Sequence, residues 1–172
     1  MHCHLIYGIQ IWSCGNASSI TALFRKQKSA IRIISNSHYN AHTEPVFKNL
    51  GILPLPSLCD FFKLQLMQRY VQGFLPVSFN DTWVTRAAFR GFSAPMVLRN
   101  SEDLYIPFAK LSQTSSQPYF CFPRLWNEFY DNHSISIIRD KFEFKTALKK
   151  YFLEKLQNNI ICNRLFCPAC SL

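Results

Sequence analysis

The stretch from Ser19 to Ser35 constrains the fold most, because it has the pattern of a long amphipathic helix. Ser18 or Ser19 offers a side-chain oxygen to the free backbone N–H groups of the first turn. Apolar residues then recur at three- and four-residue intervals, as on the packed face of a helix: Ile20, Leu23, Phe24, Ile31 and Ile34. Basic residues are spread over the rest of the surface: Arg25, Lys26, Lys28 and Arg32. We therefore expect one packed face and one positive face.

Other segments also predict helices. A short apolar segment from Ile6 to Trp12 precedes the long helix. A short helix from Glu44 to Leu50 should end at Gly51, since glycine accepts positive φ at a helix C-terminus. Pro54 and Pro56 are expected to block any continuation, so that Ser57 caps the next helix, about Leu58–Gly73. Its apolar face consists of Leu58, Phe61, Phe62, Met67, Tyr70, Val71 and Phe74.

Two more helices are expected near the end of the chain. A short one spans about Phe120–Tyr130, and a longer one about Arg139–Asn158. The longer helix has acidic residues in its first turn and Lys155 in its last, which suits the helix dipole. We expect it to direct Phe142, Leu148, Phe152 and Leu156 inward. Its outward residues are then Lys141, Lys145, Lys149 and Lys150.

The middle of the chain has a different character. Proline recurs too evenly between residues 75 and 123 for long helices, and the composition of Ser112–Pro118 is that of a loop. Met96–Leu98 and Leu104–Phe108 are candidates for a short β-hairpin. The sequence thus predicts a mainly α fold with an irregular, partly β-hairpin middle and a C-terminal helix. Within one domain we distinguish residues 1–74, 75–123, 124–158 and a Cys-containing tail, 159–172.

The composition limits the kinds of partner. Nineteen Lys and Arg against ten Asp and Glu give a net charge of +9, which favours contact with phosphate backbones but also serves solubility. Hydrophobic residues make up 48% of the chain and charged residues only 17%. Such a composition suggests apolar surface that a neighbouring domain or protein covers.

Several motifs occur in an order that resembles one protein family. They are Tyr7-Gly8-Ile9 with Trp12, Gln27–Ile34, His42 with Pro45–Phe47 and Leu50–Leu55, Thr85-Arg86, Leu104–Pro107, Leu125–Asn127, and Phe142–Lys145 with Leu148–Leu153. This order is similar to the region after the catalytic palm in reverse transcriptases of jockey-like non-LTR retrotransposons. The resemblance covers about residues 4–156. It departs from the family pattern at Ser13 and Cys14, which stand between Trp12 and Gly15.

The resemblance implies a helical, thumb-like module that grips the template–primer duplex beside the palm. The residues expected to touch phosphates are Arg25, Lys26, Lys28 and Arg32, with Lys145, Lys149 and Lys150 as a second stripe. The intact family enzyme uses Mg²⁺ held by paired aspartates, and this chain contains no Asp-Asp pair. We therefore expect a C-terminal fragment of an RNA-directed DNA polymerase that is inactive alone and binds no cofactor.

Two alternatives remain open. In the first, the chain is a non-catalytic module whose apolar face binds the missing palm domain or another protein. In the second, it is an inactive relic of a mobile element. The sequence contains neither a Gly-x-Ser-x-Gly elbow nor a phosphate-binding Gly-rich loop. We therefore do not expect a small-molecule enzyme.

The seven cysteines indicate the compartment and one candidate metal site. Odd-numbered, scattered thiols without a secretory leader or a membrane-length apolar run predict an intracellular protein of the cytoplasm or nucleus. Cys167 and Cys170 have the spacing of two zinc ligands, and Cys162 is a candidate third. A fourth ligand would have to come from Cys3, His2, His4 or another distant residue. Three ligands do not complete a structural site, so we expect free thiols and no bound zinc.

Overall fold

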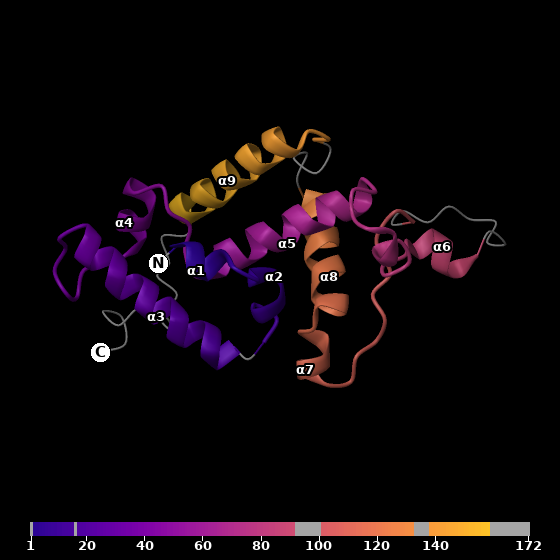
Figure 1. Ribbon diagram of the computed structural model, residues 1–172, viewed down its shortest axis with the longest axis horizontal. Helices are drawn as coiled ribbons and strands as arrows, with labels where there is room; N and C mark the ends of the chain where they lie inside the picture. Colours follow the sequence, from indigo (N-terminus) through magenta and orange to yellow (C-terminus); the bar gives the residue numbers. More distant parts are fainter. Residues whose placement is uncertain (1, 16, 92–100, 133–137, 159–172) are drawn as a thin grey trace.

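The computed structural model describes residues 2–15, 17–91, 101–132 and 138–158. Their fold is mainly helical, which confirms the predicted class (Figure 1). The helices are α1 (His2–Ile6), α2 (Ile9–Trp12), α3 (Ala17–Ile34), α4 (Glu44–Asn49), α5 (Leu55–Val71), the 3-10 turn η1 (Val77–Phe79), α6 (Arg86–Arg90), α7 (Ser112–Ser115), α8 (Pro118–Asn132) and α9 (Lys141–Asn158). No helix within these ranges is long and apolar enough to cross a membrane.

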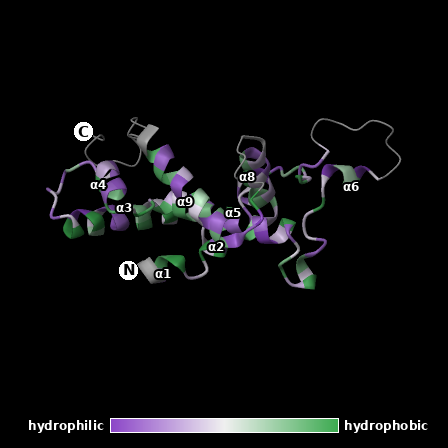
Figure 2. Cartoon of the chain, turned by 90° about the horizontal axis from the view of Figure 1, so that it is seen from above, coloured by the Kyte–Doolittle hydropathy of each residue, from purple (hydrophilic) through white to green (hydrophobic). Residues whose placement is uncertain are grey.

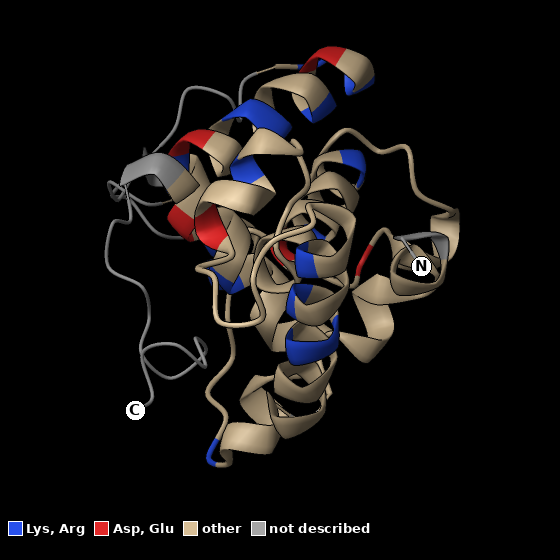
Figure 3. Ribbon diagram, turned by 90° about the vertical axis from the view of Figure 1, so that its left-hand side faces the viewer, with Lys and Arg blue, Asp and Glu red and all other residues tan. Residues whose placement is uncertain are grey.

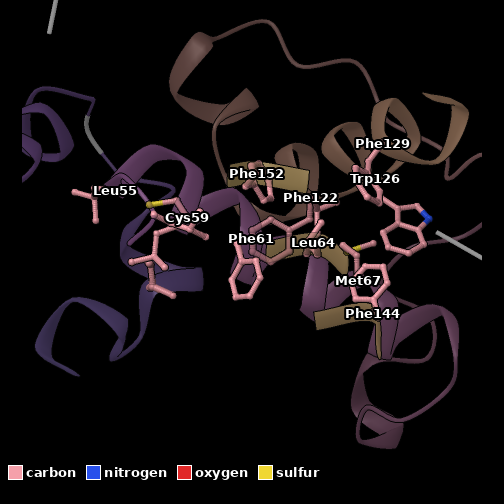
Figure 4. Packing of buried hydrophobic residues seen from close by; sticks show 14 of the residues in the cluster. Leu55, Cys59, Phe61, Leu64, Met67, Phe122, Trp126, Phe129, Phe144 and Phe152 are labelled. Carbon is pink, nitrogen blue, oxygen red and sulfur yellow. The ribbon is translucent and has the colours of Figure 1, made fainter. Parts of the chain in front are cut away.

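Helix α5 lies at the centre, and α3, α8 and α9 pack against it (Figure 1). The core is one cluster of buried apolar side chains that extends along this helix. Figure 4 shows Phe61, Leu64 and Met67 of α5 among aromatic residues of α8 and α9. The cluster reaches from Ile9 of α2 to Phe152 of α9, so it joins distant parts of the chain. Burial of this apolar surface is the main stabilising contribution.

The ends of the helices follow local sequence signals. Gly51 adopts φ 61° directly after α4, and the N–H of Ile52 donates to the carbonyl of Phe47 at 3.0 Å. This is the predicted glycine-terminated helix end. At the start of α9, a carboxylate oxygen of Asp140 accepts from the N–H groups of Phe142 and Glu143, each at 2.8 Å. Asp140 therefore caps the helix rather than lying in its first turn.

Two short backbone segments meet in the irregular middle of the chain. Thr85 and Leu104 form an antiparallel bridge, and the N–H of Arg86 donates to the carbonyl of Asp103 at 2.7 Å. The side-chain amide of Asn127 on α8 bonds both the N–H and the carbonyl of Leu104, at 3.0 and 2.9 Å. Residue 104 thus pairs with Thr85. The other arm of the predicted hairpin, residues 96–98, lies outside the described residues.

Three local predictions are wrong. Ser112–Ser115 is a short helix, not a loop. Helix α5 begins at Leu55, three residues before the predicted start, because Pro56 falls in the first turn, where a missing N–H costs nothing. Helix α8 begins at Pro118 and carries Pro123 inside it, so the expected boundary between residues 123 and 124 falls within a helix.

The predicted packing faces are partly wrong. Phe142 is 75% exposed, whereas Phe144 is fully buried with Leu148 and Phe152. On α3, Phe24 and Ile31 are buried as expected, but Ile34 is 66% exposed. The buried face of each helix therefore agrees only in part with the predicted one. On α3 the buried face also includes polar residues: Gln27, Lys28 and Arg32.

Candidate nucleic-acid interface

The four basic residues predicted on α3 separate into two pairs. Arg25 and Lys26 are exposed. Lys28 and Arg32 are buried, at 5% and 7% exposure. The prediction that all four lie on an outer positive face is therefore wrong for Lys28 and Arg32. In this conformation only Arg25 and Lys26 are open to a phosphate backbone.

The buried side chains of Lys28 and Arg32 make contacts that stabilise the fold. The Nε of Arg32 donates to the carbonyl of Ala41 at 2.9 Å, which holds the turn after α3 against the helix. The Nζ of Lys28 lies 4.7 Å from the centroid of the Phe24 ring, a cation–π distance. Both side chains also bury their aliphatic stems. Apolar periodicity alone does not distinguish such residues from a solvated positive face.

Gln27 is a structural residue that the sequence analysis missed. Its Nε2 donates to the carbonyl of Leu53 at 3.1 Å, and its Oε1 accepts from the N–H of Leu55 at 2.7 Å. This amide fastens the start of α5 to α3. One signal was present in the sequence: Gln27 lies three residues after Phe24 and four before Ile31, so it falls on the apolar stripe.

The predicted lysines of α9 are all exposed: Lys145, Lys149 and Lys150. Lys145 and Lys149 are four residues apart and therefore share one face of the helix. Lys150 forms an exposed ion pair with Glu154, with Nζ and Oε1 3.9 Å apart. Such an exposed pair contributes little to stability, so Lys150 can exchange Glu154 for a phosphate.

An apolar groove separates the basic residues of α3 from those of α9. Its volume is about 510 Å³. It is lined by Leu5, Ile6, Gln27, Ala30, Ile31, Ile34, Gly51, Ile52, Leu53, Leu58, Phe61, Phe62, Lys145 and Lys149. Lys26 lies one helical turn before Ala30, so cations flank the groove from both helices.

The surroundings of the groove are both positive and apolar. Figure 3 views the molecule from the α3 and α4 end and shows Lys and Arg on several helices there, with Asp and Glu among them. In Figure 2, α1 is coloured mostly as hydrophobic. The residues next to the lining residues Ile34 and Ile6 in the sequence are also exposed: Ile33 is 79% exposed and Tyr7 86%. A partner that covers this region therefore meets a cationic rim and an apolar floor.

The adjacent acids Glu102 and Asp103 do not form a candidate metal site. Asp103 is 7% exposed, and its carboxylate lies 3.4 Å from a guanidinium nitrogen of Arg86, so it supports the bridge at Leu104. In the part of the chain that the structure describes, no three His, Cys, Asp or Glu side chains are grouped to hold a metal. The candidate ligands Cys162, Cys167 and Cys170 lie outside that part.

Comparison of the chain with protein-family models, with curated proteins and with solved structures finds no match.

Proposed function

We propose that this chain is the C-terminal, non-catalytic part of a non-LTR retrotransposon RNA-directed DNA polymerase, and that it binds the template–primer duplex. The observation that carries the proposal is the set of exposed cations on two helices that line the same groove: Arg25, Lys26, Lys145, Lys149 and Lys150. The ordered motifs that resemble the region after the palm supply the choice of ligand. Without the paired aspartates, the chain contributes binding and no polymerisation.

Phosphate contacts dominate the affinity of such an interface, and each one releases counterions from the duplex. Five contacts predict that log Kobs falls against log salt concentration with a slope of about −4.5. Reversing all five residues to Glu changes the net charge from +9 to −1, since each reversal subtracts two charges. We expect this variant to lose the salt dependence and most of its binding to an RNA–DNA hybrid, measured by fluorescence anisotropy.

A matched control separates the position of the charges from net charge. Arg69, Arg90, Lys110, Arg124 and Arg139 are also exposed and come from other parts of the fold. Their reversal to Glu produces the same net charge of −1. We expect this control to weaken binding less and to keep most of the slope. If both variants lost the same amount of affinity for the hybrid, the interface would not lie at the five residues of α3 and α9.

The apolar groove favours a second function, in which the same region docks a protein, either the palm domain or another partner. An apolar groove of this size, lined in part by the exposed side chain of Ile34, is typical of a surface that another chain covers. This function predicts no steep salt dependence toward nucleic acid. The hybrid titration therefore distinguishes the two functions.

A further inference from the structure

Two thiols that are far apart in the sequence meet beside α5. Cys14 follows α2 and Cys121 lies in the first turn of α8, 107 residues later. Their Sγ atoms are 3.4 Å apart, and both side chains are half-buried. A disulfide needs an S–S distance of about 2.05 Å, so the sulfur atoms must approach by only about 1.4 Å. Small side-chain rotations cover such a distance.

Cys14 is the more reactive member of the pair. Its pKa is lowered from 9.0 to about 7, chiefly because Cys121 donates a hydrogen bond to its sulfur. Lys63 of α5 also lowers the pKa, while burial and the carboxylate of Asp60 raise it. Cys14 is therefore more readily deprotonated near neutral pH than an ordinary cysteine, and the thiolate is the nucleophile.

Cys59, whose side chain the structure also describes, is unreactive by comparison. Cys59 on α5 is 4% exposed, and its burial raises its pKa to about 11. It remains a thiol at neutral pH and is shielded from a solvent-borne reagent. The environment thus selects Cys14 and Cys121 for reaction with each other.

We propose that Cys14 and Cys121 form a reversible intramolecular disulfide when the chain meets a low-molecular-weight disulfide such as glutathione disulfide. The Cys14 thiolate attacks one sulfur of the reagent, forms a mixed disulfide and releases one glutathione thiolate. Cys121 then gives up its proton and attacks the Cys14 sulfur, which releases the second glutathione. Two electrons pass from the protein thiols to the reagent, and the two protons end on two molecules of reduced glutathione.

The disulfide tethers the N-terminal segment to the rest of the fold. Helix α1 supplies Leu5 and Ile6 to the apolar groove, and α1 and α2 are joined only by Tyr7 and Gly8. A bond from Cys14 to α8 therefore restrains one wall of that groove. It also closes a loop of more than 100 residues, which predicts a rise of roughly 10 °C in the melting temperature. This inference does not depend on the proposed nucleic-acid function.

Peptide mapping of the reduced full-length chain tests the proposal. The chain is equilibrated with glutathione disulfide at a pH of about 7, where Cys14 is reactive. The reaction is quenched with acid, and the protein is alkylated, digested and analysed by mass spectrometry. We expect a linked pair of peptides that contain Cys14 and Cys121, which dithiothreitol separates. Alkylation of both cysteines as free thiols would overturn the proposal, as would a glutathione adduct that persists on Cys14.

Two variants serve as controls in the same assay. Cys121→Ser removes the thiol that attacks the mixed disulfide on Cys14. Cys14 should therefore retain glutathione, and no disulfide-linked pair of peptides should appear. Cys59→Ser leaves both reacting thiols and should give the same linked pair as the unsubstituted chain. If either variant fails to fold, mapping of the unsubstituted chain still decides the proposal. A dominant link between Cys14 and any other cysteine contradicts it.

Discussion

Replacing Lys28 with Glu lowers the free energy of unfolding by about 3 kcal/mol or more, whereas the same change at Lys26 alters it by less than about 0.5 kcal/mol. The two lysines are two residues apart on α3 and undergo the same change of charge. Lys28 is 5% exposed and lies over the ring of Phe24, whose negative face attracts a cation and repels a carboxylate. Lys26 is exposed, so Glu at that position remains hydrated.

Urea denaturation followed by circular dichroism measures this difference through the midpoint at constant m-value. Lys28→Met is the informative control, because it keeps the buried aliphatic stem without a charge and should retain most of the stability. Equal effects of Lys26→Glu and Lys28→Glu would contradict the described orientation of α3. The result also decides which reversals can be used in binding experiments, since Lys28→Glu alters the fold.

Replacing Gln27 with Leu lowers the free energy of unfolding by roughly 2–5 kcal/mol, because the buried N–H of Leu55 and carbonyl of Leu53 lose their side-chain partner. The amide of Gln27 is the link that fastens the start of α5 to α3. Its loss should therefore loosen the packing of those two helices as well as lower the midpoint. Hydrogen exchange at the Leu55 amide reports that local effect directly.

Gln65 on α5 provides the matched control for Gln27. Its Nε2 is buried and has no hydrogen-bond partner among the described residues. Gln65→Leu removes a polar group that contributes no such bond, so we expect a change within about 0.5 kcal/mol or a small gain in stability. A cost at Gln65 as large as that at Gln27 would show that side-chain shape, not hydrogen bonding, governs both positions.

Local signals in the sequence predicted the longer helices but not η1, α6 or α7. Gly51 ends α4 as predicted, and Asp140 lies at the start of α9, although it caps the helix rather than lying in its first turn. Such contacts are visible in the sequence because the partners are adjacent. The mainly helical fold class follows from these elements and from their apolar periodicity.

Hydrogen bonds between polar side chains and backbone groups distant in the sequence could not be predicted from apolar periodicity. Arg32 bonds the carbonyl of Ala41 nine residues later, and Gln27 bonds residues 26 and 28 positions away. Asn127 bonds Leu104 across 23 residues. A pattern that counts apolar residues assigns these polar side chains to the surface. Lys28 and Arg32 were consequently placed in the candidate interface, although they help to build the fold.

The central claim is that exposed cations of α3 and α9 bind a nucleic-acid duplex. The most direct measurement is the affinity of the unsubstituted full chain for an RNA–DNA hybrid of about 20 base pairs, titrated from roughly 50 to 200 mM salt. Contacts from Arg25, Lys26, Lys145, Lys149 and Lys150 predict a slope of about −4.5 in log Kobs against log salt. A slope near zero, or no binding at the lowest salt, would contradict the claim and favour protein docking at the groove.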